Sequence, residues 1–121
     1  MKIKILFCGD LAPTYRNETL LLKDVDLFQD IKENIVESDI AFANLELPLT
    51  NSIKKIDKNG PCLKTSPLVI KKIKKSGLNL LGLANNHIMD YGETGLKDTL
   101  NCCKNESIDI VGAGNNILEA Q

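Results

Sequence analysis

Four short apolar runs alternate along the chain with stretches of helical periodicity, and no other feature restricts the possible folds as much. The runs cover residues 2–8, 40–43, 78–84 and 108–111. Between them, the pattern predicts helices over about 26–37, 67–77 and 93–104. Because parallel strands need a connection of about helix length, the order β-α-β-α-β-α-β predicts an α/β fold with a mainly parallel sheet.

The composition is that of one globular domain without a strong charge bias. The chain has 121 residues, 43% of them hydrophobic and 26% charged, and a formal net charge of −1. This charge gives no general attraction for nucleic acid, and two lysine groups, Lys54, Lys55, Lys58 and Lys64 and the run 71–75, are interpreted as solvated surface. The four cysteines form no Cys-x-x-Cys pair, which favours reduced thiols. Residues 2–8 are too short for a signal sequence or a membrane span, so we expect a cytoplasmic protein.

Turn-forming residues mark where the predicted elements stop. Residues 9–10 end the first strand, Pro13 begins a loop, and Gly77 ends the second helix. The run 40–43 is apolar throughout, which is typical of a strand buried on both faces. Residues 48–67 have no sustained periodicity and predict a long surface loop, a kind of segment that is often functional.

Polar side chains follow three of the predicted strands at the point where each strand ends. Asp10 follows the first run and Glu46 the second, with Asn44 between them in the chain, and residues 85–87, Asn-Asn-His, follow the third. The carboxyl ends of parallel strands lie along one edge of a sheet, and neighbouring strands are about 4.8 Å apart. Carboxylate and amide oxygens and an imidazole suit a divalent cation. The pattern therefore predicts a metal-centred site at this edge.

Each of these residues also has a purely structural interpretation. Asp10 could cap a turn, Glu46 could be a solvated surface residue, and Asn85 and Asn86 could tolerate left-handed backbone. His87 could be a hydrogen-bonding residue of its turn. The metal-site hypothesis depends on the three groups meeting at one place.

These residues also carry a resemblance to a known family. Residues 5–10, 43–50, 60–61, 83–92 and 111–115 resemble, in order and spacing, the CapA family of bacterial capsule and poly-γ-glutamate synthesis proteins. The domain of that family is similar to the calcineurin-like metallophosphoesterases. The resemblance implies a layered α/β sandwich, with this chain as the N-terminal β-α-β-α-β-α-β half, and a metal-dependent phosphoesterase-like centre.

The resemblance also implies roles for individual residues. Asp10 resembles a ligand of the first motif, Glu46 the bridging carboxylate and Asn86 the asparagine ligand of divalent metal ions such as Mn, Fe or Zn. His87 resembles the histidine that protonates a leaving oxygen.

A phosphorylated or polyanionic substrate would then meet three further candidates. These are Asn44, Asn85 and Arg16, the last of which lies in the loop after the first strand and could either clamp an anionic oxygen or be an ordinary surface arginine.

The chain departs from the phosphoesterase pattern in two ways. His87 is its only histidine, although such enzymes take further histidine ligands from later in the domain, and position 12 is Ala12 instead of histidine. We expect residues 1–121 to be one CapA-like domain and the N-terminal portion of a longer one; a partner chain or a degenerate site are the alternatives. A second function class is a non-catalytic binding or assembly component of a capsule-polymer machine. Nucleotide binding is disfavoured, because residues 112–117 lack the third glycine of the dinucleotide fingerprint.

Overall fold

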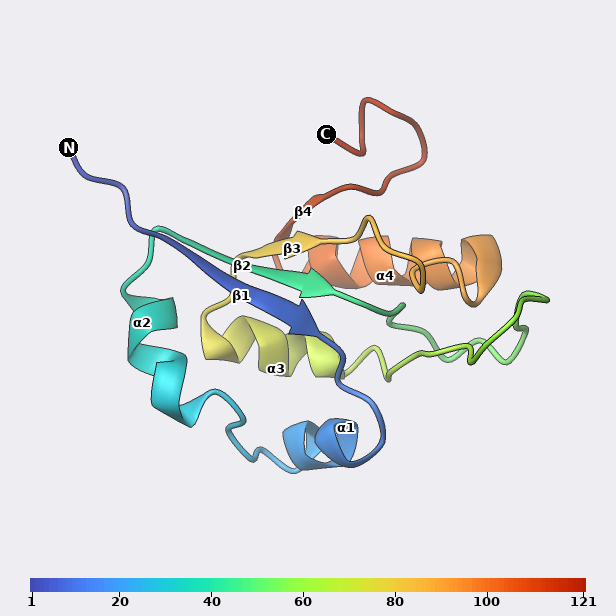
Figure 1. The fold of residues 1–121 in the computed structure, drawn as a ribbon, viewed down its shortest axis with the longest axis horizontal. Coiled ribbons are helices and arrows are strands. Elements are labelled where there is room, and N and C mark those ends of the chain that lie inside the picture. Colours follow the sequence, from blue (N-terminus) through green and yellow to red (C-terminus); the bar gives the residue numbers. More distant parts are fainter.

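The computed structural model describes all 121 residues and contains a four-stranded, all-parallel sheet in the order β1-β2-β3-β4 (Figure 1). The strands are β1 (Ile5–Leu11), β2 (Ile40–Leu45), β3 (Leu80–Gly82) and β4 (Asp109–Val111). The helices are α1 (Tyr15–Leu22), the 3₁₀ turn η1 (Gln29–Ile31), α2 (Lys32–Val36), α3 (Val69–Ser76) and α4 (Gly92–Asn105). The predicted α/β class and parallel pairing are confirmed. None of the helices combines the length and the apolar character that a membrane span requires.

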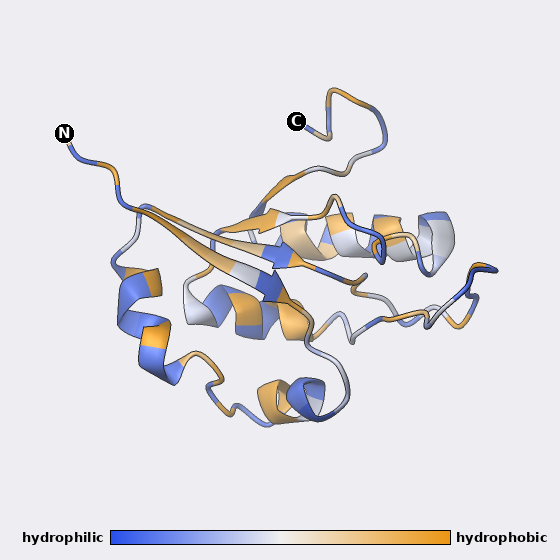
Figure 2. Ribbon diagram, in the orientation of Figure 1, coloured by the Kyte–Doolittle hydropathy of each residue, from blue (hydrophilic) through white to orange (hydrophobic).

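The helices cover one face of the sheet. Sequential strand order with right-handed crossovers places every connecting helix on the same side. A single core cluster joins β2 and β3 to all four α-helices through buried residues that include Ala43, Leu81, Leu21, Ile35, Ile73 and Cys103. Figure 2 shows apolar residues along β1 and β2, hydrophilic residues near the carboxyl ends of these two strands, and both kinds of residue on each helix.

The opposite face of the sheet is open and apolar. Ile5, Phe7 and Val111 are 50%, 73% and 38% exposed, and the rings of Phe7 and Phe42 pack with their centroids 5.5 Å apart. The prediction that residues 40–43 are buried on both faces is therefore wrong, because alternate residues of β2 are only half-buried. All-parallel sheets are normally covered on both faces.

A β-bulge decides which face Asp10 occupies. The predicted end of the first strand at residue 8 is wrong, because β1 continues to Leu11 through Gly9, whose φ is +74°. The register with β2 jumps from Phe7 opposite Phe42 to Asp10 opposite Asn44, so β1 carries one extra residue. In a regular strand residues 7 and 10 would face opposite sides, and the extra residue brings Asp10 to the side of Phe7.

The helices between β1 and β2 differ from the sequence prediction. Helix α1 follows Pro13, where a loop was predicted, and the helix predicted over 26–37 is reduced to η1 and α2. The Asp26 carboxylate accepts the Phe28 N–H at 3.0 Å, and this Asx turn delays the start of the helix. The predicted end of α3 is confirmed, because Gly77 caps it in the left-handed conformation with φ +100°.

The long segment between β2 and α3 has no helix or strand of its own, as predicted. Its two ends are joined by an isolated bridge between Leu49 and Thr65. The Thr50 N–H donates to the Thr65 carbonyl at 3.0 Å, and the Thr65 N–H donates to the Pro48 carbonyl at 3.1 Å. Residues 51–64 therefore form a loop that begins and ends at the same place, beside the carboxyl ends of the strands (Figure 1).

Candidate functional site

Asn44 joins the two predicted carboxylate ligands. Its Nδ2 donates to Asp10 Oδ1 at 2.9 Å and to Glu46 Oε1 at 3.3 Å. The two carboxylates come from different strands, Asp10 from β1 and Glu46 from the residue that follows β2. Two anionic oxygens thus surround one amide nitrogen at the carboxyl edge of the sheet. The positive edge of a single amide only partly offsets the repulsion between them.

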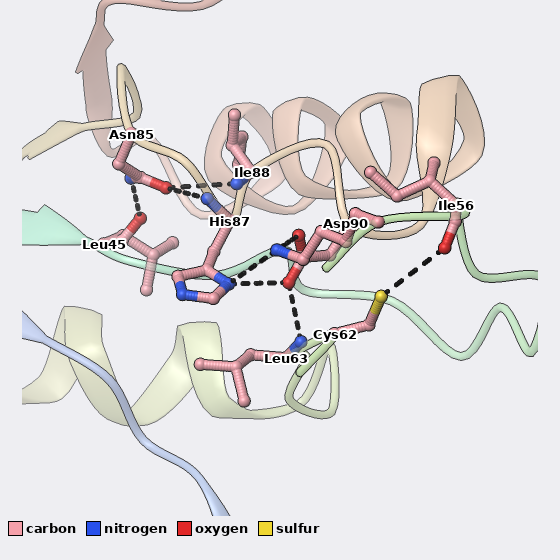
Figure 3. A network of polar contacts seen from close by, with 9 residues as sticks. Leu45, Ile56, Cys62, Leu63, Asn85, His87, Ile88 and Asp90 are labelled. Carbon is pink, nitrogen blue, oxygen red and sulfur yellow. Dashed lines mark hydrogen bonds and ion pairs between the residues drawn. The ribbon is translucent and has the colours of Figure 1, made fainter. Parts of the chain in front are cut away.

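Asn85 connects this carboxylate pair to the turn after β3. Its Nδ2 donates to Asn44 Oδ1 at 3.3 Å and to the Leu45 carbonyl at 2.8 Å. Its Oδ1 accepts the backbone N–H groups of His87 at 3.1 Å and Ile88 at 3.0 Å (Figure 3). These four bonds use the two donors and two acceptor positions of the side chain. Asn85, predicted as a substrate-binding residue, therefore has its polar groups engaged inside the protein and fixes the position of the His87 turn.

His87 is held by a buried aspartate. Its Nδ1 lies 2.7 Å from Asp90 Oδ2, and the side chains of His87 and Asp90 are 15% and 0% exposed. Figure 3 shows the second ring nitrogen, Nε2, on the side of the ring turned away from Asp90. Nε2 is therefore the atom available for exchange of a proton with a ligand.

Asp90 is also bound by the long segment. Lys58 Nζ forms an ion pair with Asp90 Oδ1, and the Leu63 N–H donates to Asp90 Oδ2 at 2.7 Å. Burial by itself would raise the pKa of the Asp90 carboxyl, but the hydrogen bonds that it accepts outweigh burial and lower the pKa below its usual value. The carboxylate is thus ionised at neutral pH and can act only as an acceptor.

Sequence reasoning assigned no role to either Asp90 or Lys58. An acidic residue three positions after the only histidine was the available signal for Asp90, because a tight turn brings such positions together. Lys58 gave no signal, since it lies 29 positions from His87 in a segment without periodicity.

Two predicted site residues stand outside this network. Asn86 is exposed, and Arg16 is exposed in the first turn of α1. A hollow beside Asp10 is lined by residues that include Pro13, Asn17 and Phe28, and Arg16 is not among them. The structure therefore brings together Asp10, Asn44, Glu46, Asn85 and the His87 turn, and leaves Asn86 and Arg16 at the surface.

The donor set suits a hard divalent cation in kind. Carboxylate oxygens, here those of Asp10 and Glu46, are ligands that such cations prefer. No group of three or more His, Cys, Asp or Glu side chains in the chain is arranged to hold a metal ion. A cation bound here would therefore need further ligands, such as amide oxygens or water, beyond the two carboxylates.

Known proteins resemble this chain over most of its length. Residues 4–121 match the family of bacterial capsule synthesis proteins, PGA_cap. The chain is 37% identical over 119 residues to the PGA biosynthesis protein CapA of Bacillus subtilis (strain 168), covering 95% of this chain and 31% of that protein. It is 34% identical over 99 residues to the capsule biosynthesis protein CapA of Bacillus anthracis, covering 78% of this chain and 24% of that protein.

A third relative is a probable polyglutamine synthesis accessory protein of Mycobacterium tuberculosis (strain ATCC 25618 / H37Rv), 32% identical over 84 residues. That match covers 69% of this chain and 22% of the relative. The chain thus spans less than a third of the length of each of these relatives. Because the family match covers nearly every residue, the chain belongs to the bacterial capsule synthesis protein family PGA_cap.

Proposed function

We propose that this member of the capsule and poly-γ-glutamate biosynthesis family carries part of a metal-dependent phosphoesterase-like centre. The observation that supports the proposal best is the carboxylate pair, because Asp10 and Glu46 both contact the Nδ2 atom of Asn44. Two carboxylates held this close favour a bound cation, which would offset their repulsion. The substrate would be a phosphorylated or polyanionic small molecule or polymer.

In this proposal Asp10 and Glu46 would hold the cation, and the exposed Asn86 would add a neutral amide oxygen. A divalent ion such as Mn, Fe or Zn would supply a bound water of lowered pKa and would polarise a phosphoryl oxygen. His87 donates a proton from Nε2 to the leaving oxygen, a contribution of about 10²–10⁴-fold in rate. Asp90 fixes the ring and stabilises its positive charge.

Turnover of a chromogenic aryl phosphodiester by the intact protein with Mn²⁺ tests the catalytic proposal. Asp10→Asn and Glu46→Gln remove a ligand charge at nearly constant shape and should abolish turnover, and His87→Ala should reduce it by about 10²-fold or more. Glu93→Gln, a change of an exposed acid on α4, is the matched control and should leave turnover unchanged. Equal turnover in all four variants would refute the proposed centre.

The second candidate function is a non-catalytic binding or assembly component of a capsule-polymer machine. Its support is the small number of charged ligands, since the chain provides one histidine and brings no three metal-binding side chains together. Titration of Mn²⁺ into the intact protein discriminates the two functions. Binding of the metal without turnover of any phosphate ester would favour the assembly role.

We also propose that the open face of the sheet is covered by the remaining half of a longer domain or by a partner chain. The exposed Phe7 and Ile5 side chains support this, as does the greater length of the relatives. No nucleic-acid partner is proposed. The cytoplasmic location expected from the sequence stays a prediction, which cell fractionation can test.

A further inference from the structure

We propose that Lys58 is a positioning residue for His87 and that it acts through Asp90. The inference rests on the proposed role of His87 as proton donor. Lys58 belongs to the long segment between β2 and α3, and its Nζ contacts Asp90 Oδ1 while lying 3.3 Å from His87 Nδ1. A residue from an irregular loop therefore completes the support of the only imidazole in the chain.

Asp90 is the place where the long segment is fixed to the domain. The Ile56 N–H donates to the Asp90 carbonyl at 3.0 Å, and the Leu63 N–H donates to Oδ2 of the same residue at 2.7 Å. Between these contacts Lys58 forms the ion pair, and its side chain is only 20% exposed. Much of the rest of the segment is exposed, with Ile53 at 89%. The conformation of the segment and that of Asp90 therefore depend on each other.

The positive charge of Lys58 is required to compensate the carboxylate of Asp90, because this carboxylate is completely buried. A buried carboxylate is costly unless it is paired and hydrogen-bonded, and Lys58 is the only lysine or arginine that contacts it. By occupying Oδ1, Lys58 leaves Oδ2 for the ring of His87. Loss of the ammonium group leaves the carboxylate without a permanent cation.

This arrangement fixes one tautomer of the neutral ring. An ionised carboxylate has no proton to give, so the proton of the 2.7 Å contact must belong to His87 Nδ1. The lone pair of the neutral ring then lies on Nε2, away from Asp90 (Figure 3). The Lys58 ammonium lies 3.3 Å from Nδ1 and can only donate, so it finds no acceptor on a protonated Nδ1 and supports this tautomer through Asp90.

The test is ring ¹⁵N NMR at alkaline pH, where an imidazole is neutral. Because the chain has one histidine, both ring signals belong to His87, and their couplings to the ring C–H protons distinguish Nδ1 from Nε2. In the unmodified chain we expect a protonated Nδ1 and an unprotonated Nε2. In Lys58→Met the two shifts should move toward each other as both tautomers become populated. Lys58→Arg should restore the original pattern, and Lys55→Met, a change of an exposed lysine in the same segment, should not alter it.

An unmodified chain with its ring proton on Nε2 would overturn the proposal without any variant, which covers the case in which Lys58→Met does not fold. An unchanged Nδ1-protonated ring in folded Lys58→Met would also overturn it. With the aryl phosphodiester, Lys58→Met should lower kcat about 10-fold or more with little change in KM. Absence of turnover in the unmodified intact protein would instead count against the phosphoesterase function, while the tautomer result stands separately.

Discussion

Replacing Asn85 with alanine is the most direct test of how the sheet edge is built. The side chain forms four hydrogen bonds, two as donor to Asn44 and the Leu45 carbonyl and two as acceptor from backbone N–H groups of the following turn. Each such bond contributes about 0.5–1.5 kcal/mol net. Because the site is only partly buried and water can replace some of the lost partners, we expect Asn85→Ala to lower the free energy of unfolding by about 2–4 kcal/mol.

The neighbouring residue provides a matched control. Asn86 has the same side chain and the adjacent position, but it is exposed and lies outside the network, so Asn86→Ala should change the free energy of unfolding by less than about 0.5 kcal/mol. Urea unfolding followed by circular dichroism measures both values, with the slope of the transition as a check that the unfolded state is unchanged. Equal losses in the two variants, or a loss below about 1 kcal/mol in Asn85→Ala, would show that the four bonds do not hold the edge together.

Three further predictions concern stability. The pKa of Asp90 is lowered in the folded state, so the contribution of this carboxylate to stability is present at neutral pH and is lost as pH falls below about 4. In urea unfolding, the free energy of unfolding of Asp90→Asn should therefore fall less over that pH range than that of the unmodified chain. Parallel pH profiles of the two proteins would contradict this. Gly9→Ala should lower the free energy of unfolding by about 1–2 kcal/mol, because alanine disfavours the positive φ of this position. No steric contribution is expected, since an added Cβ meets no atom within 4 Å. An unchanged melting temperature in thermal unfolding would exclude strain at the bulge. Phe7→Ser should lower the free energy of unfolding by less than about 1 kcal/mol in the 121-residue chain, where this side chain is exposed. In a longer polypeptide that covers the open face, the loss should approach about 3–5 kcal/mol. Similar losses in both proteins would argue against such a cover.

The parts of the fold that depend on local pattern could be predicted. Strands β2 and β4 and helix α4 lie close to their predicted positions, because short apolar runs and a 3.6-residue apolar period mark the segments that reach the core. Gly77 ended α3 as expected, since a glycine readily adopts the left-handed backbone that closes a helix. Helix α1 was missed because its eight residues have weak amphipathic character and only Leu21 is buried.

The candidate site was predictable in part of its membership, because Asp90 and Lys58 were missed and Asn86 and Arg16 lie outside the network, and its connections were not predictable. Parallel strands bring their carboxyl ends to one edge whatever their exact register, so Asp10, Asn44 and Glu46 could be placed together from the order of elements alone. Their hydrogen bonds could not be predicted, because the extra residue in β1 reverses the direction of Asp10 and no local pattern announces it.

The amino-acid sequence by itself determined the parallel α/β architecture, the edge at which the polar residues gather and the family to which the chain belongs. Only the tertiary structure decided that Asp10 and Glu46 share the amide of Asn44, that one face of the sheet is open, and that Lys58 reaches Asp90 from 32 positions away. The physical reason is that periodicity records the burial of each residue within its own element. The distance between residues on different elements depends instead on strand register and on the path of the loops, which the packing of the whole domain sets.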